Sequence, residues 1–385
     1  MPEDWEHGGF GLYIHWPFCQ AKCPYCDFNS HVVAQIDQTA WERAYLSDID
    51  RVGAETQGRV LRSVFFGGGT PSMMDPGLVD AVLTRVRATW PIANDIEITL
   101  EANPTSVEAG RFAGYRDAGV NRVSMGIQAL NDADLKALGR LHSAKEAMVA
   151  FETARNVFDR VSFDLIYARQ GQTLAAWQTE LQQALGMAID HLSLYQLTIE
   201  SGTAFGDRYA AGKLRDLPDE DLSADMYTAT QEICAAEGFD GYEVSNHARP
   251  GCESIHNQIY WRYGDYAGIG PGAHGRLTLG GQRYATETPL GPAVWLKQVI
   301  ATGRGELSRE LLSADDQIAE MLLMGMRLDE GVSLERLNLE ENRYLSININ
   351  GLVDMDLVRI DAGKLRLTAA GKPLLNAVLR ELLRS

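Results

Sequence analysis

Short apolar runs alternate with longer segments of helical pattern between about residues 9 and 245. Runs typical of strands occupy Phe10–His15, Val60–Phe66, Ile96–Leu100, Arg122–Ile127, Val161–Ile166 and His191–Ile199. Residues that favour helix starts lie between them: Asp75 before Pro76, and the capping-box pairs Thr105 with Glu108 and Ser143 with Glu146. Gly119 suits the end of a helix. Repeated strand and helix units predict a parallel sheet with helices packed outside it.

The number of these units separates two architectures. Six units fit an incomplete (β/α)6 barrel of the α/β class better than a closed barrel of eight, and an open doubly wound sheet is the alternative. In both architectures, ligand sites lie at the carboxyl ends of the strands. Polar residues or glycines fall at these ends: Cys19, the triplet Gly67–Gly69, Glu101, Gln128 and Asp164. The sequence therefore predicts one functional site at this edge.

The pattern changes in the last third of the chain. Residues 246–276 are rich in Gly, His, Asn and aromatic residues, and we expect long ordered loops there. Further on, helical segments and a hairpin are expected at Asp315–Met326, Ser333–Leu337, Asn350–Met355, and Leu357–Ile360 with Leu365–Leu367. Three helices and a hairpin suggest a small winged-helix-like α+β domain over 300–385, after a main domain over 1–290.

Charge and composition limit the classes of partner. Hydrophobic residues make up 45% of the 385 residues, as in globular proteins, and the formal net charge is −17. Such a charge disfavours nucleic acid and anionic lipid as primary partners, so we expect a docking role for the C-terminal domain rather than DNA binding. No apolar run is long enough to span a membrane, and the acidic N-terminus lacks a signal peptide. We therefore expect a cytoplasmic protein, peripheral at membranes through a protein partner.

Three of the five cysteines form the motif C-x3-C-x2-C at Cys19, Cys23 and Cys26. Thiolates at this spacing suit three irons of a 4Fe–4S cluster, and the fourth iron is then open to a small molecule. Zinc is the alternative, with His15 or His31 as its fourth ligand. The odd number of cysteines argues against a disulfide framework and for a reducing compartment.

Several further segments extend this motif into a family pattern. They are Tyr13-Ile-His-Trp-Pro-Phe-Cys19, Phe66-Gly-Gly-Gly-Thr-Pro71, Glu101-Ala-Asn-Pro104, Ser124-Met-Gly-Ile-Gln128 and Phe163-Asp-Leu-Ile-Tyr167. With the cysteines, they resemble the radical S-adenosylmethionine (SAM) superfamily. Nearly the whole chain resembles the family of oxygen-independent coproporphyrinogen III oxidase and its relatives.

The resemblance implies a 4Fe–4S cluster on the three cysteines, with SAM on the open iron. The positions that match the family's SAM site are Tyr13, Tyr25, Gly68, Gly69, Thr70, Glu101, Gln128, Arg140 and Asp164. Carboxylates suit the ammonium group or ribose hydroxyls of SAM, and an arginine suits its carboxylate. Taken singly, each of these side chains has an ordinary surface or capping role as its alternative.

Two departures separate the chain from the decarboxylating oxidases and resemble the haem-chaperone branch of the family. The oxidase motif continues to a fourth cysteine where this chain has Phe28, and only eighteen residues precede Cys19. A third feature, the motif H-N-x-x-Y-W, agrees with that branch, and its residues are His256, Asn257, Tyr260 and Trp261. A smaller departure is Ala168-Arg-Gln-Gly171, where the family has a Gly-Leu-Pro turn.

The motif is the expected haem site. Histidine is a common ligand of haem iron, and Tyr260 and Trp261 suit the face of a porphyrin. Rival ligands are Cys252, His247 and His274. An alternative for the motif is a loop in which its polar residues bond only to the backbone.

We therefore expect a protein that binds haem b and delivers it to haemoproteins such as respiratory cytochromes. A homodimer remains an open alternative to a monomer. The competing function is radical decarboxylation of coproporphyrinogen III to protoporphyrinogen IX, so whether the chain is an enzyme stays open at this point. A DNA-binding regulator is the third hypothesis.

Overall fold

The computed structural model describes residues 3–339 and 342–384, and its largest element is a twelve-stranded sheet. All six predicted strands form, and they lie parallel and side by side in chain order. They are β1 (Phe10–Trp16), β4 (Leu61–Gly68), β5 (Ile92–Ala102), β6 (Arg122–Gln128), β7 (Arg160–Tyr167) and β8 (His191–Gln196). Their carboxyl ends therefore meet at one edge, as the sequence predicts.

Both sides of this parallel core carry further strands. Beside β1, β11 (Asp265–Ile269) is also parallel, and β12 (His274–Leu279), β13 (Gln282–Glu287) and β14 (Ser308–Leu311) follow antiparallel. Beside β8, β10 (Asn246–Ala248) and β9 (Asp240–Gly241) are antiparallel. The hydrogen-bonded order runs linearly from β14 to β9.

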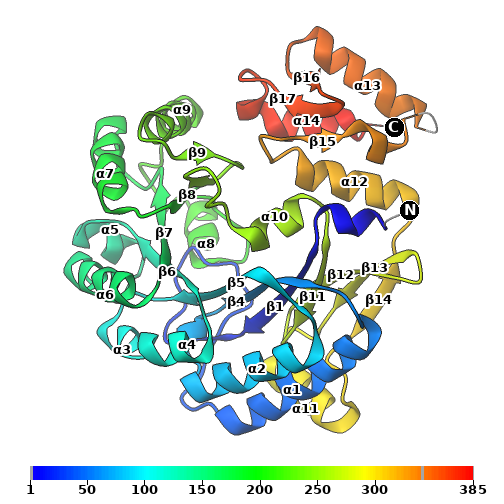
Figure 1. Ribbon diagram of the computed structural model, residues 1–385. Coiled ribbons are helices and arrows are strands. Elements are labelled where there is room, and N and C mark those ends of the chain that lie inside the picture. Colours follow the sequence, from blue (N-terminus) through cyan, green and yellow to red (C-terminus); the bar gives the residue numbers. More distant parts are fainter. Residues whose placement is uncertain (1–2, 340–341, 385) are drawn as a thin grey trace.

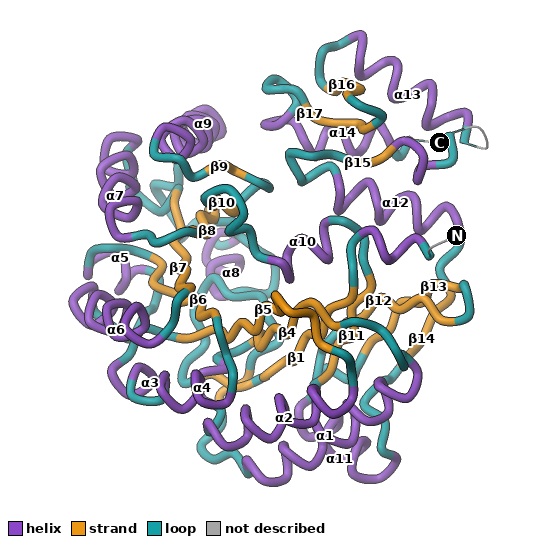
Figure 2. The backbone as a smooth tube through the Cα atoms, in the orientation of Figure 1, coloured by secondary structure: helices purple, strands orange, loops and turns teal. Residues whose placement is uncertain are grey.

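The helices that connect the parallel strands lie along the outer side of the curved sheet (Figures 1 and 2). The longer ones are α1 (Gln38–Glu55), α2 (Pro76–Thr89), α6 (Ala144–Val157) and α7 (Leu174–Met187), and α9 (Glu220–Ala236) follows β8, the last of the six parallel strands. Shorter connecting helices are α3 (Ser106–Ala109), α4 (Phe112–Ala118) and α5 (Asp132–Ala137), and α8 (Ala204–Ala210) lies between β8 and α9 in the chain. Short 3-10 turns are η1 (Asp4–His7) and η2 (Pro71–Met73).

The predicted helix boundaries agree with the structure in part. The capping box of Ser143 and Glu146 is confirmed, because each side chain accepts a hydrogen bond from the other's backbone N–H. The Asp75 carboxylate makes no capping bond, although α2 begins directly after it. Gly119 ends α4 in the left-handed conformation, as expected.

The expectation of long loops over 246–276 is wrong. This stretch holds β10, the helix α10 (Ile255–Trp261), β11 and the start of β12. Ser254 begins α10 by accepting a hydrogen bond from the Asn257 N–H at 3.4 Å. The polar composition suggested loops, but the side chains of Ser254 and His256 are buried against polar partners on the strands.

Large aromatic residues fill the core between the first strand and the outer helices. Trp16 of β1 packs against Trp41 and Tyr45 of α1, and Trp41 stacks on Trp295 of α11 (Pro292–Thr302) with ring centroids 5.4 Å apart. All four side chains are buried. This packing holds β1, and with it the start of the cysteine loop, against α1 and α11.

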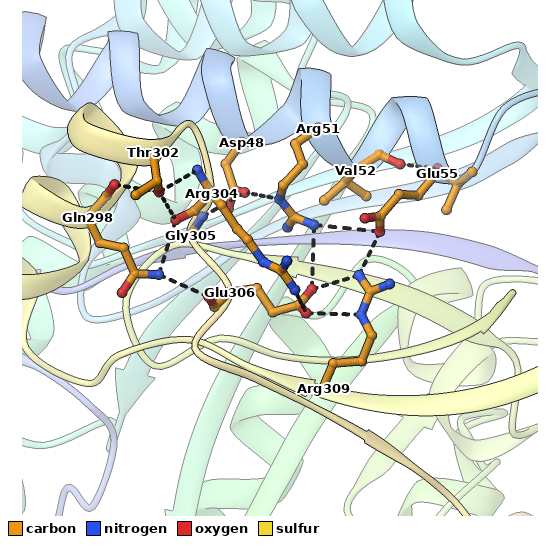
Figure 3. A network of polar contacts seen from close by, with 11 residues as sticks. Asp48, Arg51, Val52, Glu55, Gln298, Thr302, Arg304, Gly305, Glu306 and Arg309 are labelled. Atoms are coloured by element: carbon orange, nitrogen blue, oxygen red, sulfur yellow. Dashed lines mark hydrogen bonds and ion pairs between the residues drawn. The ribbon is translucent and has the colours of Figure 1, made fainter.

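A polar network joins α1 to the segment between α11 and β14 (Figure 3). The buried Asp48 accepts hydrogen bonds from Arg51 Nε at 2.8 Å and from the Gly305 N–H at 3.0 Å. Glu306 binds Arg309 through both carboxylate oxygens, at 2.9 and 2.8 Å. Because Asp48 and Glu306 are buried and paired, they fix the antiparallel extension of the sheet to α1.

The C-terminal part of the chain has a hydrophobic core of its own, built mainly from residues after 320. Its elements are α12 (Ala314–Gly325), η3 (Leu334–Leu337), α13 (Arg343–Asp354) and α14 (Leu375–Leu382), with β15 (Val332–Ser333), β16 (Val358–Asp361) and β17 (Lys364–Leu367). A short 3-10 turn, η4 (Lys372–Leu374), precedes α14. The expected hairpin is present as β16 and β17. The helix expected from Ser333 is instead the end of β15 followed by the 3-10 turn η3, and α14 was not expected. No helix of the described residues is long and apolar enough to cross a membrane.

Candidate cofactor site

The three cysteines of the motif lie on the loop that follows β1. Cys19 is on the short strand β2 (Phe18–Cys19), which pairs with β3 (His31–Val32), and the Cys26 N–H donates to the Cys23 carbonyl at 3.1 Å. All three thiols are free and partly buried. They face one cavity of about 150 Å³ at the carboxyl ends of the parallel strands.

This cavity brings together nearly all residues of the expected SAM site. Its lining includes Tyr25, Gly68, Gly69, Thr70, Glu101, Gln128, Arg140 and Asp164. Tyr13 is the exception, since it lies deeper in the sheet, with its hydroxyl 3.0 Å from His15 Nδ1. The structure therefore brings the other eight predicted residues together at the carboxyl ends of the strands, and their role in SAM binding stays a prediction.

The glycines at the end of β4 form a close-packed ledge beside Cys19. Gly68 has φ +109°, in the region that favours glycine, and a Cβ there would meet the His15 ring. A Cβ on Gly69 would lie 2.7 Å from the Phe18 carbonyl oxygen. Thr70 follows, and its hydroxyl donates to Cys19 Sγ at 3.3 Å. The ledge thus sets the position of Cys19.

Two carboxylates face the cavity, Glu101 from β5 and Asp164 from β7, on either side of β6. Removal from water, and next the charge of Asp164, raise the pKa of Glu101 to about 8. Removal from water likewise raises the pKa of Asp164 to about 6, against a hydrogen bond from Ser193 and the charge of Arg122. A cationic ligand would offset this cost, so the pair suits a molecule with an ammonium or sulfonium group.

Arg140 connects the cysteine loop to the strands. Its guanidinium donates to Cys23 Sγ at 3.4 Å, to Asn103 Oδ1 at 2.7 Å and to the Gly126 carbonyl at 2.8 Å. Its buried Nε has no hydrogen-bond partner among the described residues. Asn103 also donates to the Thr70 hydroxyl at 3.2 Å, so it bridges the two sides of the cavity.

Asn103 and Ser124 line the cavity but were not among the predicted site residues. Ser124 donates to Asp164 Oδ1 at 3.4 Å. Asn103 directly follows β5, so the strand-end signal that identified Glu101 was available for it too, whereas Ser124 lies inside β6.

The donor set fits an iron–sulfur cluster. Burial raises the pKa of the Cys19 and Cys26 thiols, so an electropositive group is needed to hold them as thiolates. Within residues 3–339 and 342–384, no three His, Cys, Asp or Glu side chains are grouped so as to hold a single metal ion. A 4Fe–4S cluster, by contrast, binds each thiolate through a different iron.

The H-N-x-x-Y-W motif lies on α10, on the inner side of the sheet near the starts of β1 and β4 (Figure 1). His256 is buried and stacks on Phe65, with ring centroids 4.8 Å apart. Its Nδ1 lies 2.7 Å from Ser63 Oγ, and its Nε2 lies 2.9 Å from the Tyr260 hydroxyl. Removal from water, and next the charge of Arg122, lower its pKa to about 3. Both ring nitrogens are engaged in this conformation, so haem ligation by His256 stays a prediction.

The other members of the motif divide between the interior and the surface. Asn257 donates to the Tyr242 hydroxyl at 3.4 Å, and the Tyr260 ring packs on Tyr266. Trp261, at the end of α10, lines a groove that faces the C-terminal part of the chain. The motif is therefore not part of the cysteine cavity.

The three rival ligands lie on different elements. His247 is buried, and neither of its ring nitrogens has a hydrogen-bond partner among the described residues. Cys252 is partly buried in the turn before α10. His274 begins β12 and is 59% exposed.

Comparison with known proteins agrees with this geometry. The model of the radical SAM superfamily matches residues 13–183, and that of the HemN C-terminal domain matches residues 312–374. Among solved structures, coproporphyrinogen III oxidase (HemN) from Escherichia coli is similar, with a TM-score of 0.81 at 21% identity over 97% of this chain and 90% of that one. At this identity the likeness shows the fold alone.

Relatives at higher identity define the family more closely. The chain is 39% identical over 384 residues to the mitochondrial radical S-adenosyl methionine domain-containing protein 1 of Bos taurus, and the aligned region covers 97% of this chain and 87% of the relative. It is 44% identical over 270 residues to the heme chaperone HemW of E. coli strain K12, 70% of each chain. It is 35% identical over 379 residues to HemW of Mycobacterium tuberculosis strain H37Rv, 97% of this chain and 95% of the relative.

The fold, the cysteine cavity and the family models define a radical SAM protein with a HemN-type C-terminal region. Membership of this superfamily implies a 4Fe–4S cluster and SAM. Within it, the chain belongs to the family of the heme chaperone HemW and the mitochondrial radical S-adenosyl methionine domain-containing protein 1.

Proposed function

We propose that this protein is a haem carrier, which binds haem b and delivers it to haemoproteins such as respiratory cytochromes. The observation that carries the proposal is the 35% identity to a protein named heme chaperone, over 95% of that relative's length. The replacement of the oxidase's fourth cysteine by Phe28 supports it, because that side chain is 61% exposed and offers no ligand.

We assign the 4Fe–4S cluster to Cys19, Cys23 and Cys26, and SAM to the cavity that these cysteines share with Glu101 and Arg140. The donor chemistry supports this assignment, since three free thiols line a cavity together with the Arg140 guanidinium and two carboxyl groups, Glu101 and Asp164, whose pKa values are raised by burial. When bound, such a cluster supplies one-electron chemistry. The chain's own residues position the groups: Thr70 holds Cys19, and Arg140 holds Cys23.

The rival function is decarboxylation of coproporphyrinogen III, and an anaerobic turnover assay separates the two. The protein with a reconstituted cluster is mixed with SAM, a strong reductant and coproporphyrinogen III, and the porphyrin products are analysed. We expect no multiple-turnover formation of protoporphyrinogen IX from protein whose cluster is spectroscopically intact. Sustained formation of that product would establish the oxidase function instead.

The net charge of −17 also limits how such a carrier reaches a membrane. An acidic surface is repelled by anionic lipid, so this cytoplasmic carrier would reach membrane cytochromes through a basic protein partner. Binding to native membranes should therefore exceed binding to protein-free anionic vesicles. Equal binding to both would contradict a protein partner.

A further inference from the structure

A groove of about 860 Å³ separates the end of α10 from the C-terminal part of the chain. Trp261 of the H-N-x-x-Y-W motif, Met321 of α12 and Val332 of β15 contribute apolar surface to its lining. His7, at the end of η1, and Lys364, at the start of β17, line it as well. In Figure 1, the N-terminal turn and α12 lie beside the end of α10. The groove therefore brings together residues that are far apart in the sequence.

The size and lining of the groove suit a large flat ligand. Small-molecule sites typically enclose about 300–1,000 Å³ and combine apolar walls with a few polar groups. The indole Nε1 of Trp261 is buried and has no hydrogen-bond partner among the described residues. The imidazole of His7 is exposed, and no hydrogen bond or ion pair to another described residue engages it. An aromatic wall suits the porphyrin face, and an imidazole without a protein partner is a common ligand of haem iron.

Three cations and three carboxylates line the groove, so a haem propionate would bind there by taking the place of a protein carboxylate. Arg336 pairs with the partly exposed Asp4 at 2.7 Å, and Lys364 lies 3.7 Å from Glu330. Glu330 also pairs with Arg262. The long, partly exposed pair of Lys364 with Glu330 contributes little to stability, so Lys364 can exchange its partner for a ligand carboxylate at small cost. Arg336 holds Asp4 through two hydrogen bonds, at 2.7 and 2.8 Å, and its exchange costs more.

We propose that this groove is the haem site, with His7 as the iron ligand, Trp261 against the porphyrin face and the propionates beside Arg336 and Lys364. This inference rests on the proposed haem-carrier function and deepens it. It also divides the motif by role: His256 anchors α10 in the interior through both ring nitrogens, and Trp261 contacts the ligand. The C-terminal part of the chain then closes one wall of the site.

Haem b titrations of the full chain test the assignment. His7→Ala changes an exposed residue, so folding is not at risk, and we expect an altered Soret band and at least a tenfold loss of affinity. Trp261→Leu should weaken binding as well. His274→Ala is the matched control, because it removes another exposed histidine away from the groove, and it should bind haem b as the unaltered chain does.

Haem b dimethyl ester, which lacks the propionate charges, supplies the second measurement. The unaltered chain should prefer haem b to the ester, and Lys364→Glu should remove most of that preference. Unchanged spectra and affinities in both His7→Ala and Trp261→Leu would overturn the groove as the site while leaving the carrier function intact. Failure of the unaltered chain to bind haem b would remove the carrier function itself, and this site with it.

Discussion

The ledge of glycines beside Cys19 offers the sharpest structural test of the cluster site. In a Gly69→Ala variant, the added methyl group would lie 2.7 Å from the Phe18 carbonyl oxygen and 2.9 Å from the Phe18 backbone N. The Phe18 carbonyl cannot easily retreat, because it accepts a hydrogen bond from the Thr70 N–H at 2.8 Å. Relief of the clash must therefore displace the strand that carries Cys19.

The expected magnitude follows from the contact distances. The methyl must move about 0.7 Å from the Phe18 oxygen to reach ordinary contact at 3.4 Å. Overpacking of this kind costs about 1–3 kcal/mol. If this cost falls on the cluster-binding loop conformation, the apparent affinity for the cluster drops about 5- to 150-fold.

Iron and labile sulfide per chain, measured after anaerobic reconstitution, provide the assay. Gly77→Ala is the matched control, because no atom lies within 4 Å of the added methyl on α2. We expect full cluster content in Gly77→Ala and a clear loss in Gly69→Ala. The reasoning would be refuted if Gly69→Ala retained the iron and sulfide content of the unaltered chain.

Three further substitutions address the carboxylates, the arginine and the interior. The pKa of Glu101 is raised from 4.5 to about 8 in the folded protein. Between these pH values the unfolded chain binds fewer protons at Glu101 than the folded chain does, so the free energy of unfolding falls as the pH rises from 4.5 to 8. Glu101→Gln should therefore raise the melting temperature of the cluster-free protein more at pH 8 than at pH 5. An equal change in melting temperature at both pH values would contradict this reasoning. The same variant should weaken SAM binding in equilibrium dialysis. Arg140→Lys should keep the cluster but weaken SAM binding about tenfold or more, through loss of charge-assisted hydrogen bonds. SAM binding by Arg140→Lys that equals that of the unaltered chain in equilibrium dialysis would refute this expectation. Glu97→Ala should lower the free energy of unfolding by about 3–5 kcal/mol, because it removes an ion pair with Arg160 and leaves the buried Ser254 hydroxyl and His256 N–H without their acceptor. The exposed Glu152→Ala should have little effect in the same urea titration. Similar losses in the two variants would count against the buried pair.

The parallel core and its site could be predicted from sequence because both depend on short-range signals. Apolar runs mark the strands, and the carboxyl ends of parallel strands necessarily meet, so Glu101 and Asp164 had to converge. The bridging role of Asn103 was beyond such reasoning, because its partner Arg140 lies 37 residues away and approaches only in the folded chain.

Two of the missed helices, α10 and α14, show different limits of the sequence. The helix α10 was missed because its polar face is buried: the His256 N–H and the Ser254 hydroxyl both donate to Glu97, which lies more than 150 residues earlier in the chain. The helix α14 could have been found, since Leu375, Val378, Leu379 and Leu382 follow the helical period and form its buried face.

Transfer of haem to an acceptor tests the central claim most directly. The protein, with its cluster reconstituted and loaded with haem b, is mixed with a haem-free b-type cytochrome, and the Soret band of the cytochrome is followed over time. A carrier should fill the acceptor faster than an equal concentration of free haem b does, with a rate that saturates as the acceptor concentration rises. Filling no faster than from free haem b would contradict the account.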